Sequence, residues 1–300
     1  DSFQMKKYIL TLITAVLLTL TCAQPGLAAP RHDTSKPPVY YQNQVAVLLY
    51  HNLDKHENGI TITPQRFQQH LDMLQQKGYN VIDLKTLELF LQGQTHIPPN
   101  AVLITFDDGY QSVYQYAYPV LQKRHMPATL FVIVNHMGAT EGEIPKITWE
   151  EAREMQAAGF SIQSHSYDSH AEITVNELGD TGPALTSRIY FRDKRHFESE
   201  YEYHERIKKD LTLSRSVLKS KLGQPSISLA VPLGKENRSV EEVAKKTGFK
   251  YIFTTVPGLI DAKTTPTQLN RINAGQAGLS AQSLHRRIMQ YTEDPEEHLD

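Results

Sequence analysis

Two adjacent carboxylates stand at the end of an apolar, β-branched run in this chain. Residues 101–105 read Ala-Val-Leu-Ile-Thr, and Phe106, Asp107, Asp108 and Gly109 follow them. Such a run predicts a buried strand that delivers its last residues into a turn. Neighbouring carboxylates repel each other, which raises one pKa unless a cation holds them. A metal ion would hold one aspartate and leave the other free to act as a base. A purely structural Asp-Asp-Gly turn is the alternative.

A second polar cluster follows about sixty residues later. Residues 164–170 read Ser-His-Ser-Tyr-Asp-Ser-His and come directly after the strand-like run 160–163. One aspartate and two histidines are common ligands of a catalytic zinc-type site, which keeps a further position open for water. The chain contains 13 histidines, so a chance pair has to be weighed. A histidine pair past one strand and an aspartate pair past another nevertheless favour a metal site.

The two motifs, TFDDGY and SHSYDSH, resemble those of the polysaccharide deacetylases of carbohydrate esterase family 4, the NodB-homology domain. The five-residue step from His165 to His170 is closest to the branch that deacetylates poly-β-1,6-N-acetylglucosamine. The resemblance runs over roughly residues 45–287 and implies that Asp108, His165 and His170 bind one divalent metal ion. It also implies that Asp107 is the catalytic base. Zn²⁺ is the default ion, and Co²⁺, Ni²⁺ and Fe²⁺ are alternatives because imidazole and carboxylate also suit them.

A deacetylase must also protonate its departing amine. Most of the family uses a histidine in a late Leu-x-His motif, and the late run 269–272 of this chain has none. In the poly-N-acetylglucosamine branch an early Tyr-His supplies this group, and Tyr50-His51 matches that arrangement. The resemblance therefore implies that His51 is the catalytic acid. A histidine that merely caps a strand is the alternative.

The third family motif departs from the pattern. Residues 231–234 read Val-Pro-Leu-Gly where the branch usually has Tyr-Pro-Tyr-Gly, so both aromatic side chains are missing. The arginine that usually tethers the base is not visible at this motif either. Arg271 is the candidate replacement.

Strand and helix patterns alternate along the chain from residue 45 onward. Alternation of this kind predicts a parallel sheet, and seven or eight strands over about 250 residues predict one closed or distorted barrel. The resemblance implies the same fold, a distorted (β/α) barrel of about seven strands. The strands are expected at residues 45–50, 81–84, 101–105, 128–134, 160–163, 227–231, 251–255 and 269–272. Residues 172–200 show no clean periodicity and are interpreted as a loop, which as a hypothesis lines a sugar groove.

Catalytic groups of such barrels lie at the carboxyl ends of the strands. His51, the aspartate pair and the histidine pair each follow a different expected strand. His70 and His285 fall on expected helices and are interpreted as structural. His136 follows a strand but has no partner nearby in the sequence, and it is interpreted as a surface residue.

Composition and the amino-terminal pattern set the broad class. The 300 residues are 40% hydrophobic and 21% charged, as in an ordinary globular chain, and a net charge of -2 argues against a nucleic-acid partner. Residues 5–29 have the charged start, short apolar run and small residues of a signal peptide. The only cysteine, Cys22, lies within it. We expect a signal peptide at 1–29, of which 1–4 precede the apparent start, a linker at 30–43, a catalytic domain at 44–290 and an acidic tail at 291–300.

The leading hypothesis is a secreted or cell-surface, metal-dependent hydrolase. It would remove N-acetyl groups from an N-acetylglucosamine polymer, either poly-β-1,6-N-acetylglucosamine or a related envelope polysaccharide. Peptidoglycan or chitooligosaccharide deacetylation is the alternative, and a non-catalytic envelope polysaccharide-binding protein is the hypothesis from another class. A glycoside hydrolase would need its carboxyls about 5 Å or more apart and would leave the histidine pair idle. We expect a monomer with peripheral membrane or cell-wall association, or a retained signal that acts as an anchor.

Overall fold

The computed structural model describes residues 37–140, 144–234 and 237–292. The described residues from Pro38 onward form one compact unit. The expected signal peptide, the first part of the linker and most of the acidic tail lie outside the described residues. Within the described part of the chain, no helix combines the length and the apolarity that a membrane crossing requires.

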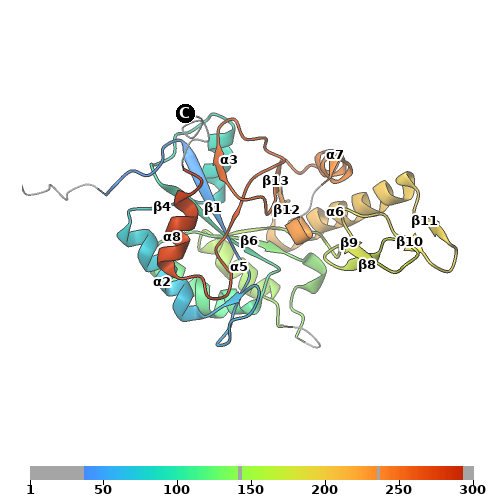
Figure 1. Cartoon of the computed structure of the whole chain (residues 1–300), viewed down its shortest axis with the longest axis horizontal. Helices are drawn as coiled ribbons and strands as arrows, with labels where there is room; N and C mark the ends of the chain where they lie inside the picture. The colour runs from blue at the N-terminus through green and yellow to red at the C-terminus, as the bar shows by residue number, and fades with distance from the viewer. Residues whose placement is uncertain (1–36, 141–143, 235–236, 293–300) are drawn as a thin grey trace, which may run out of the picture. The chain divides into compact units, whose positions relative to one another are not determined.

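Nine strands form the central sheet: β1 (Gln44–Tyr50), β4 (Asn80–Val81), β5 (Ala101–Asp107), β6 (Thr129–Val132), β7 (Ser161–Ser164), β12 (Ser228–Ala230), β13 (Tyr251–Phe253), β14 (Leu259–Asp261) and β15 (Ile272–Asn273). Seven of them follow one another in the order β13-β12-β7-β6-β5-β1-β14, while β15 pairs with β1 and β4 with β5. β14 runs antiparallel to β1, and the other pairs are parallel. The predicted α/β architecture, a distorted barrel of about seven strands, is confirmed (Figure 1).

The helices connect these strands: α2 (Pro64–Gln76), α3 (Leu84–Leu91), α4 (Tyr118–Lys123), α5 (Trp149–Ala157), α6 (Glu200–Leu222), α7 (Arg238–Thr247) and α8 (Ala281–Met289). Three short turns of other type are the π-helix η1 (Val113–Ala117) and the 3-10 helices η2 (Val134–His136) and η3 (Pro232–Gly234). Two of the helices begin at side-chain caps that local sequence chemistry favours. The Thr63 side chain caps α2 ahead of a proline, and Thr148 and Glu151 form a capping box at α5.

Four segments differ from the sequence expectation. The strand expected at 269–272 is present only as Ile272–Asn273, and Leu269 forms an isolated bridge with Phe253. The strand predicted at 81–84 is wrong beyond Val81, because Asp83 caps α3 and Leu84 is already helical. The short antiparallel edge strand β14 was not predicted at all. The segment interpreted as a loop at 172–200 contains two hairpins, β8 (Glu172–Thr174) with β9 (Thr181–Pro183) and β10 (Tyr190–Phe191) with β11 (His196–Phe197). They lie along α6 in Figure 1.

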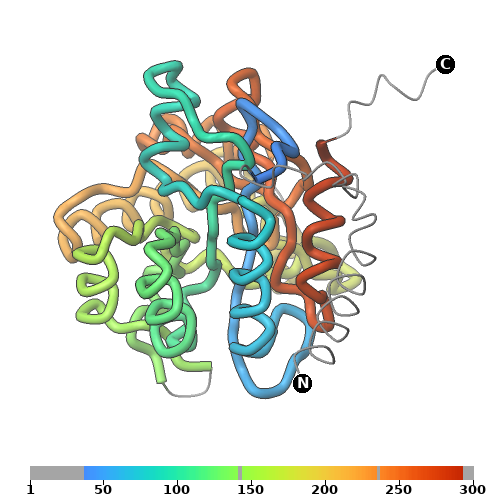
Figure 2. Tube along the Cα trace, turned by 90° about the vertical axis from the view of Figure 1, so that its left-hand side faces the viewer, coloured from blue at the N-terminus to red at the C-terminus, as the bar shows by residue number. Residues whose placement is uncertain are grey.

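The two faces of the sheet bury different clusters. In β1, Ala46, Leu48 and Tyr50 belong to one cluster and Val45 and Val47 to another, as the alternation of side chains along a strand requires. Helices α2 and α8 pack side by side over the first cluster (Figures 1 and 2).

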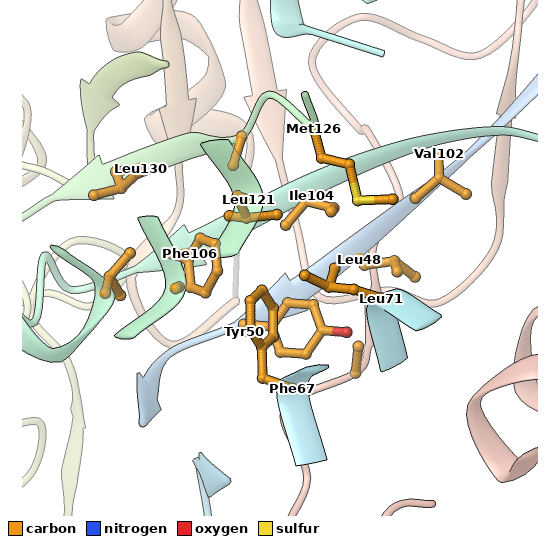
Figure 3. Close-up of a cluster of buried hydrophobic side chains, with 14 of the residues drawn as sticks. Leu48, Tyr50, Phe67, Leu71, Val102, Ile104, Phe106, Leu121, Met126 and Leu130 are labelled. Atoms are coloured by element: carbon orange, nitrogen blue, oxygen red, sulfur yellow. The ribbon is translucent and has the colours of Figure 1, made fainter. Parts of the chain in front are cut away.

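Aromatic rings concentrate at the centre of this first cluster. The Tyr50 ring lies 5.1 Å from Phe67 and 5.6 Å from Phe106, measured between ring centroids (Figure 3). Phe67 comes from α2, whereas Tyr50 and Phe106 come from the ends of β1 and β5. The packing therefore fixes the ends of the two strands from which the polar residues emerge.

Candidate metal centre and active site

Parallel pairing carries the predicted site residues to one edge of the sheet. β1 and β5 stay in register up to Tyr50 and Phe106, so His51 and Asp107 emerge from neighbouring strands. β7 lies two strands beyond β5 and delivers His165 to the same edge. The placement expected for catalytic groups of a barrel is therefore present.

Three ligand atoms converge at this edge. Asp108 Oδ1 lies 3.3 Å from His165 Nε2 and 3.0 Å from His170 Nε2, and the three side chains form a group whose ligand atoms lie within 4.8 Å of one another. Ligands of a tetrahedral ion with bonds of 2.0–2.2 Å are roughly 3.3–3.6 Å apart. Asp108 Oδ1 is buried, and within the described chain it accepts no hydrogen bond. The donor set and its spacing therefore fit a divalent metal ion.

The His165 ring is fixed in one tautomer. Its Nδ1 lies 2.8 Å from the carbonyl oxygen of Ala230, which can only accept a hydrogen bond, so Nδ1 carries the proton. The lone pair of Nε2 then faces Asp108, as a metal ligand requires. Burial lowers the pKa of His165, but Asp107 and Asp108 outweigh this effect and raise it. The surroundings thus favour a positive charge at this point, which a metal ion supplies in place of the proton.

The second aspartate has a different partner. Asp107 is buried, and its two oxygens accept hydrogen bonds of 2.7 and 2.8 Å from the guanidinium of Arg271. Arg271 is 1% exposed and also donates Nε to the Thr254 carbonyl at 2.8 Å. Burial would raise the pKa of Asp107, but Arg271 and His165 outweigh it and hold the pKa below its usual value. Arg271, the candidate replacement tether, therefore contacts the expected base directly.

Asp108 also has a pKa unlike that of an ordinary buried acid. Burial would raise the pKa of Asp108, but the two imidazoles beside it hold the pKa well below its usual value. Both aspartates are thus ionised, one beside a guanidinium and the other beside the two imidazoles.

His51 stands at the rim of this cluster. Burial lowers its pKa, the charges of Asp107 and Asp108 raise it, and Arg271 lowers it. These couplings place the ring within electrostatic reach of both aspartates. Its Nδ1 is buried without a hydrogen-bond partner among the residues the structure describes. His51 is thus part of the cluster although it lies more than fifty residues from the other members.

A cavity of about 280 Å³ opens beside the ligands and is lined by Asp108, Tyr110, Ile133, His136, Ile144, Lys146 and His170. The Lys146 ammonium lies 3.8 Å from the centre of the Tyr110 ring, and Lys146 is 5% exposed. A β-bridge between Tyr110 and Lys146 brings the two together. No sequence motif contains Lys146, and its place in the wall was not predicted.

His136 also belongs to this wall, and 28% of its side chain is exposed, as fits a residue at the protein surface. Its Nε2 lies 3.1 Å from Asp168 Oδ1, in the segment between His165 and His170. The available signal was its position after β6. Its partner could not be predicted from the sequence, because Asp168 comes 32 residues later.

The third family motif, which differs from the usual pattern in this chain, forms the turn after β12. Gly234 has φ +67°, and a Cβ there would lie within 2 Å of the Thr255 side chain, so only glycine fits. Leu233, also left-handed with φ +59°, is 44% exposed. An exposed leucine therefore stands where the branch usually carries an aromatic residue.

The fold and the site agree with comparisons to known proteins. The family model "Polysaccharide deacetylase" matches residues 95–252, more than half of the chain. The poly-β-1,6-N-acetyl-D-glucosamine N-deacetylase of Escherichia coli K12 is 26% identical, in a match that covers 85% of this chain and 41% of that protein. The Staphylococcus epidermidis protein of the same name is 26% identical, in a match that covers 83% of this chain and 86% of that protein.

A solved structure shows the same fold. The de-N-acetylase of Aggregatibacter actinomycetemcomitans superposes with a TM-score of 0.73 at 24% identity, over 82% of this chain and all of that one. The chain belongs to the polysaccharide deacetylase family, a family of hydrolases. It spans less than half the length of the E. coli relative.

Proposed function

We propose that this protein is a metal-dependent N-deacetylase of N-acetylglucosamine polymers, with poly-β-1,6-N-acetylglucosamine as the leading substrate. The observation that carries the proposal is that the two neighbouring aspartates have different partners. Asp107 is bound through both oxygens to Arg271, whereas Asp108 presents a buried oxygen without a hydrogen bond to two imidazoles. The first arrangement suits a positioned base, and the second suits a metal ligand.

Asp108, His165 and His170 would hold the ion, with Zn²⁺ as the default and Co²⁺, Ni²⁺ and Fe²⁺ as alternatives. When bound, a divalent ion there polarises the amide carbonyl and makes water more acidic.

The chain's own residues then supply the proton transfers. Asp107 takes the proton of the attacking water, since each oxygen bound to Arg271 retains a second lone pair. Arg271 keeps the carboxylate ionised and oriented between turnovers. His51 gives a proton to the amine nitrogen as the amide C–N bond breaks, which releases acetate and a free amino sugar.

The test is acetate release from poly-β-1,6-N-acetylglucosamine oligomers, measured with the protein as purified, after chelation and after Zn²⁺ is added back. We expect release that chelation abolishes and Zn²⁺ restores. Chitooligosaccharides and peptidoglycan fragments, measured in parallel, test the alternative substrates. Zn²⁺-independent release would contradict the metal role. No release from any of these glycans would favour a non-catalytic polysaccharide-binding protein.

We also propose that the protein works outside the cytoplasmic membrane, as a monomer at the cell envelope. The support for export is the signal-peptide pattern of residues 5–29. Fractionation of cells that express the full chain, followed by light scattering of the purified protein, tests both points. Retention in the cytoplasm or a stable dimer would contradict them.

A further inference from the structure

The segment between the two histidine ligands is bound by a carboxylate from α6. Asp210 Oδ1 accepts a hydrogen bond of 2.9 Å from the backbone N–H of Tyr167. Asp210 Oδ2 accepts one of 2.8 Å from the N–H of Asp168 and one of 2.9 Å from the hydroxyl of Ser169. One carboxylate thus accepts hydrogen bonds from three consecutive residues, none of which belongs to a helix or a strand.

This segment needs such support because it makes a sharp turn. Ser166 has φ +70°, a left-handed conformation that is unfavourable for a residue other than glycine. Its N–H donates to Ser164 Oγ at 3.1 Å, and its own hydroxyl accepts from the Ser169 N–H at 3.0 Å. The turn directs the chain back so that the His170 imidazole lies near the His165 imidazole, beside the same Asp108 oxygen.

Helix α6 gives Asp210 a fixed position. Ile207 and Leu211, on the same face of the helix, are fully buried in the cluster formed with α7 and β12. One turn further on, Ser214 is fully buried and its hydroxyl bonds to the hydroxyl of Ser164, at the end of β7. The carboxylate therefore reaches the turn from a packed helix and not from a mobile loop.

We propose that Asp210 is a positioning residue for the metal centre. Its carboxylate fixes residues 166–169 so that His165 and His170 converge on one ion before the ion binds. The inference rests on the metal site proposed above. An amide at this position offers one acceptor oxygen, and its N–H₂ group would face a donor of the turn, so a carboxylate is required.

The experiment compares Asp210→Asn with Glu205→Gln in the full chain. Glu205 lies on the exposed side of α6 and pairs with Lys208, so its variant makes the same charge change away from the turn. The measurement is the Kd for Zn²⁺ by competition with a chromogenic chelator, together with urea unfolding of the metal-free protein. We expect the Kd of Asp210→Asn to rise about 10- to 100-fold, the usual effect of losing an outer partner of a metal ligand. The Kd of Glu205→Gln should stay within twofold of wild type.

A purely structural role would give a different pattern. Asp210→Asn would then lower the stability of the metal-free protein and leave the Kd for Zn²⁺ unchanged, which would overturn the inference. If Asp210→Asn does not fold, Ser169→Ala decides, since it removes one of the three hydrogen bonds. We expect a Kd about two- to tenfold higher for Ser169→Ala, as for one hydrogen bond, and an unchanged Kd overturns the inference. A wild-type protein that binds no Zn²⁺ would instead refute the proposed metal centre.

Discussion

Buried histidines occur in two different settings in this protein. On the inner face of helix α2, His70 Nε2 donates to the Leu279 carbonyl at 2.8 Å, and its Nδ1 accepts from the Tyr50 hydroxyl at 3.0 Å. His285 makes a similar contact with the Tyr79 hydroxyl at 2.8 Å. The protein itself supplies partners for these rings, and their interpretation as structural agrees with these contacts.

The carboxyl-terminal edge of the sheet differs from that interior. There, His51 Nδ1 and Asp108 Oδ1 are buried, and each lacks a hydrogen-bond partner in the described part of the chain. A buried polar atom without a partner destabilises a fold, so its presence calls for a partner from outside the chain. The comparison teaches that the lack of a partner for a buried polar atom, more than burial itself, separates His51 and Asp108 from the structural histidines.

Among the substitutions that test this comparison, the one at Asp107 is expected to have the largest effect on kcat. Asp107→Asn removes the base and leaves the three proposed metal ligands in place. We expect kcat to fall about 10²–10⁴-fold, the usual contribution of a positioned general base. Metal content, measured by elemental analysis, should stay near that of the wild type. A variant that loses its metal, or one that keeps most of its activity, would show that the two aspartates have been assigned wrongly.

A somewhat smaller effect is expected at His51. His51→Ala should lower kcat about 10²-fold with the metal retained, because a general acid contributes at least this much. The acid must be protonated to act, so activity falls as pH rises through its pKa. Because burial lowers the pKa of His51, the decline in kcat/KM of the wild type should begin on the acidic side of pH 6.5.

The pH profile supplies the decisive control for this assignment. In His51→Ala the alkaline decline should disappear, while the residual rate stays sensitive to chelation. An alkaline limb that is unchanged in the variant would mean that another group protonates the amine.

The smallest effect on activity is expected at His70, which tests the structural side of the comparison. Burial lowers its pKa from 6.5 to about 4, so the unfolded chain binds the proton more readily than the folded one. The free energy of unfolding should therefore fall as pH drops from about 6.5 to 4, by at most about 3 kcal/mol from this residue. His70→Gln should reduce this pH dependence in urea unfolding experiments. The kcat of the folded, metal-loaded variant should stay within twofold of the wild type.

His70→Gln and His51→Gln form a matched pair. His70→Gln should lower the free energy of unfolding and leave kcat nearly unchanged. His51→Gln should lower kcat and leave the free energy of unfolding nearly unchanged. If both variants lost activity to the same degree, the separation of the two settings would fail.

The sequence by itself determined the alternating α/β architecture, and it pointed to the three residues of the proposed metal group. Each of these signals is local: an apolar run that ends in Asp107-Asp108, a histidine pair within one short segment, and caps such as Thr63 and Thr148. Local chemistry decides where a strand ends and which side chains follow it, so such features can be predicted without knowledge of the neighbours. The family resemblance then joined the two motifs into one group.

Only the tertiary structure decided which distant residues complete that group. Arg271 contacts Asp107 across 164 positions of the sequence. Asp210 contacts the segment between His165 and His170 from helix α6. Lys146 and His136 likewise enter the cavity wall through pairings with Tyr110 and Asp168. These contacts depend on strand register and on the packing of α6, which arise from many residues at once. A single charged residue in a sequence carries no sign of the partner that the fold will bring to it.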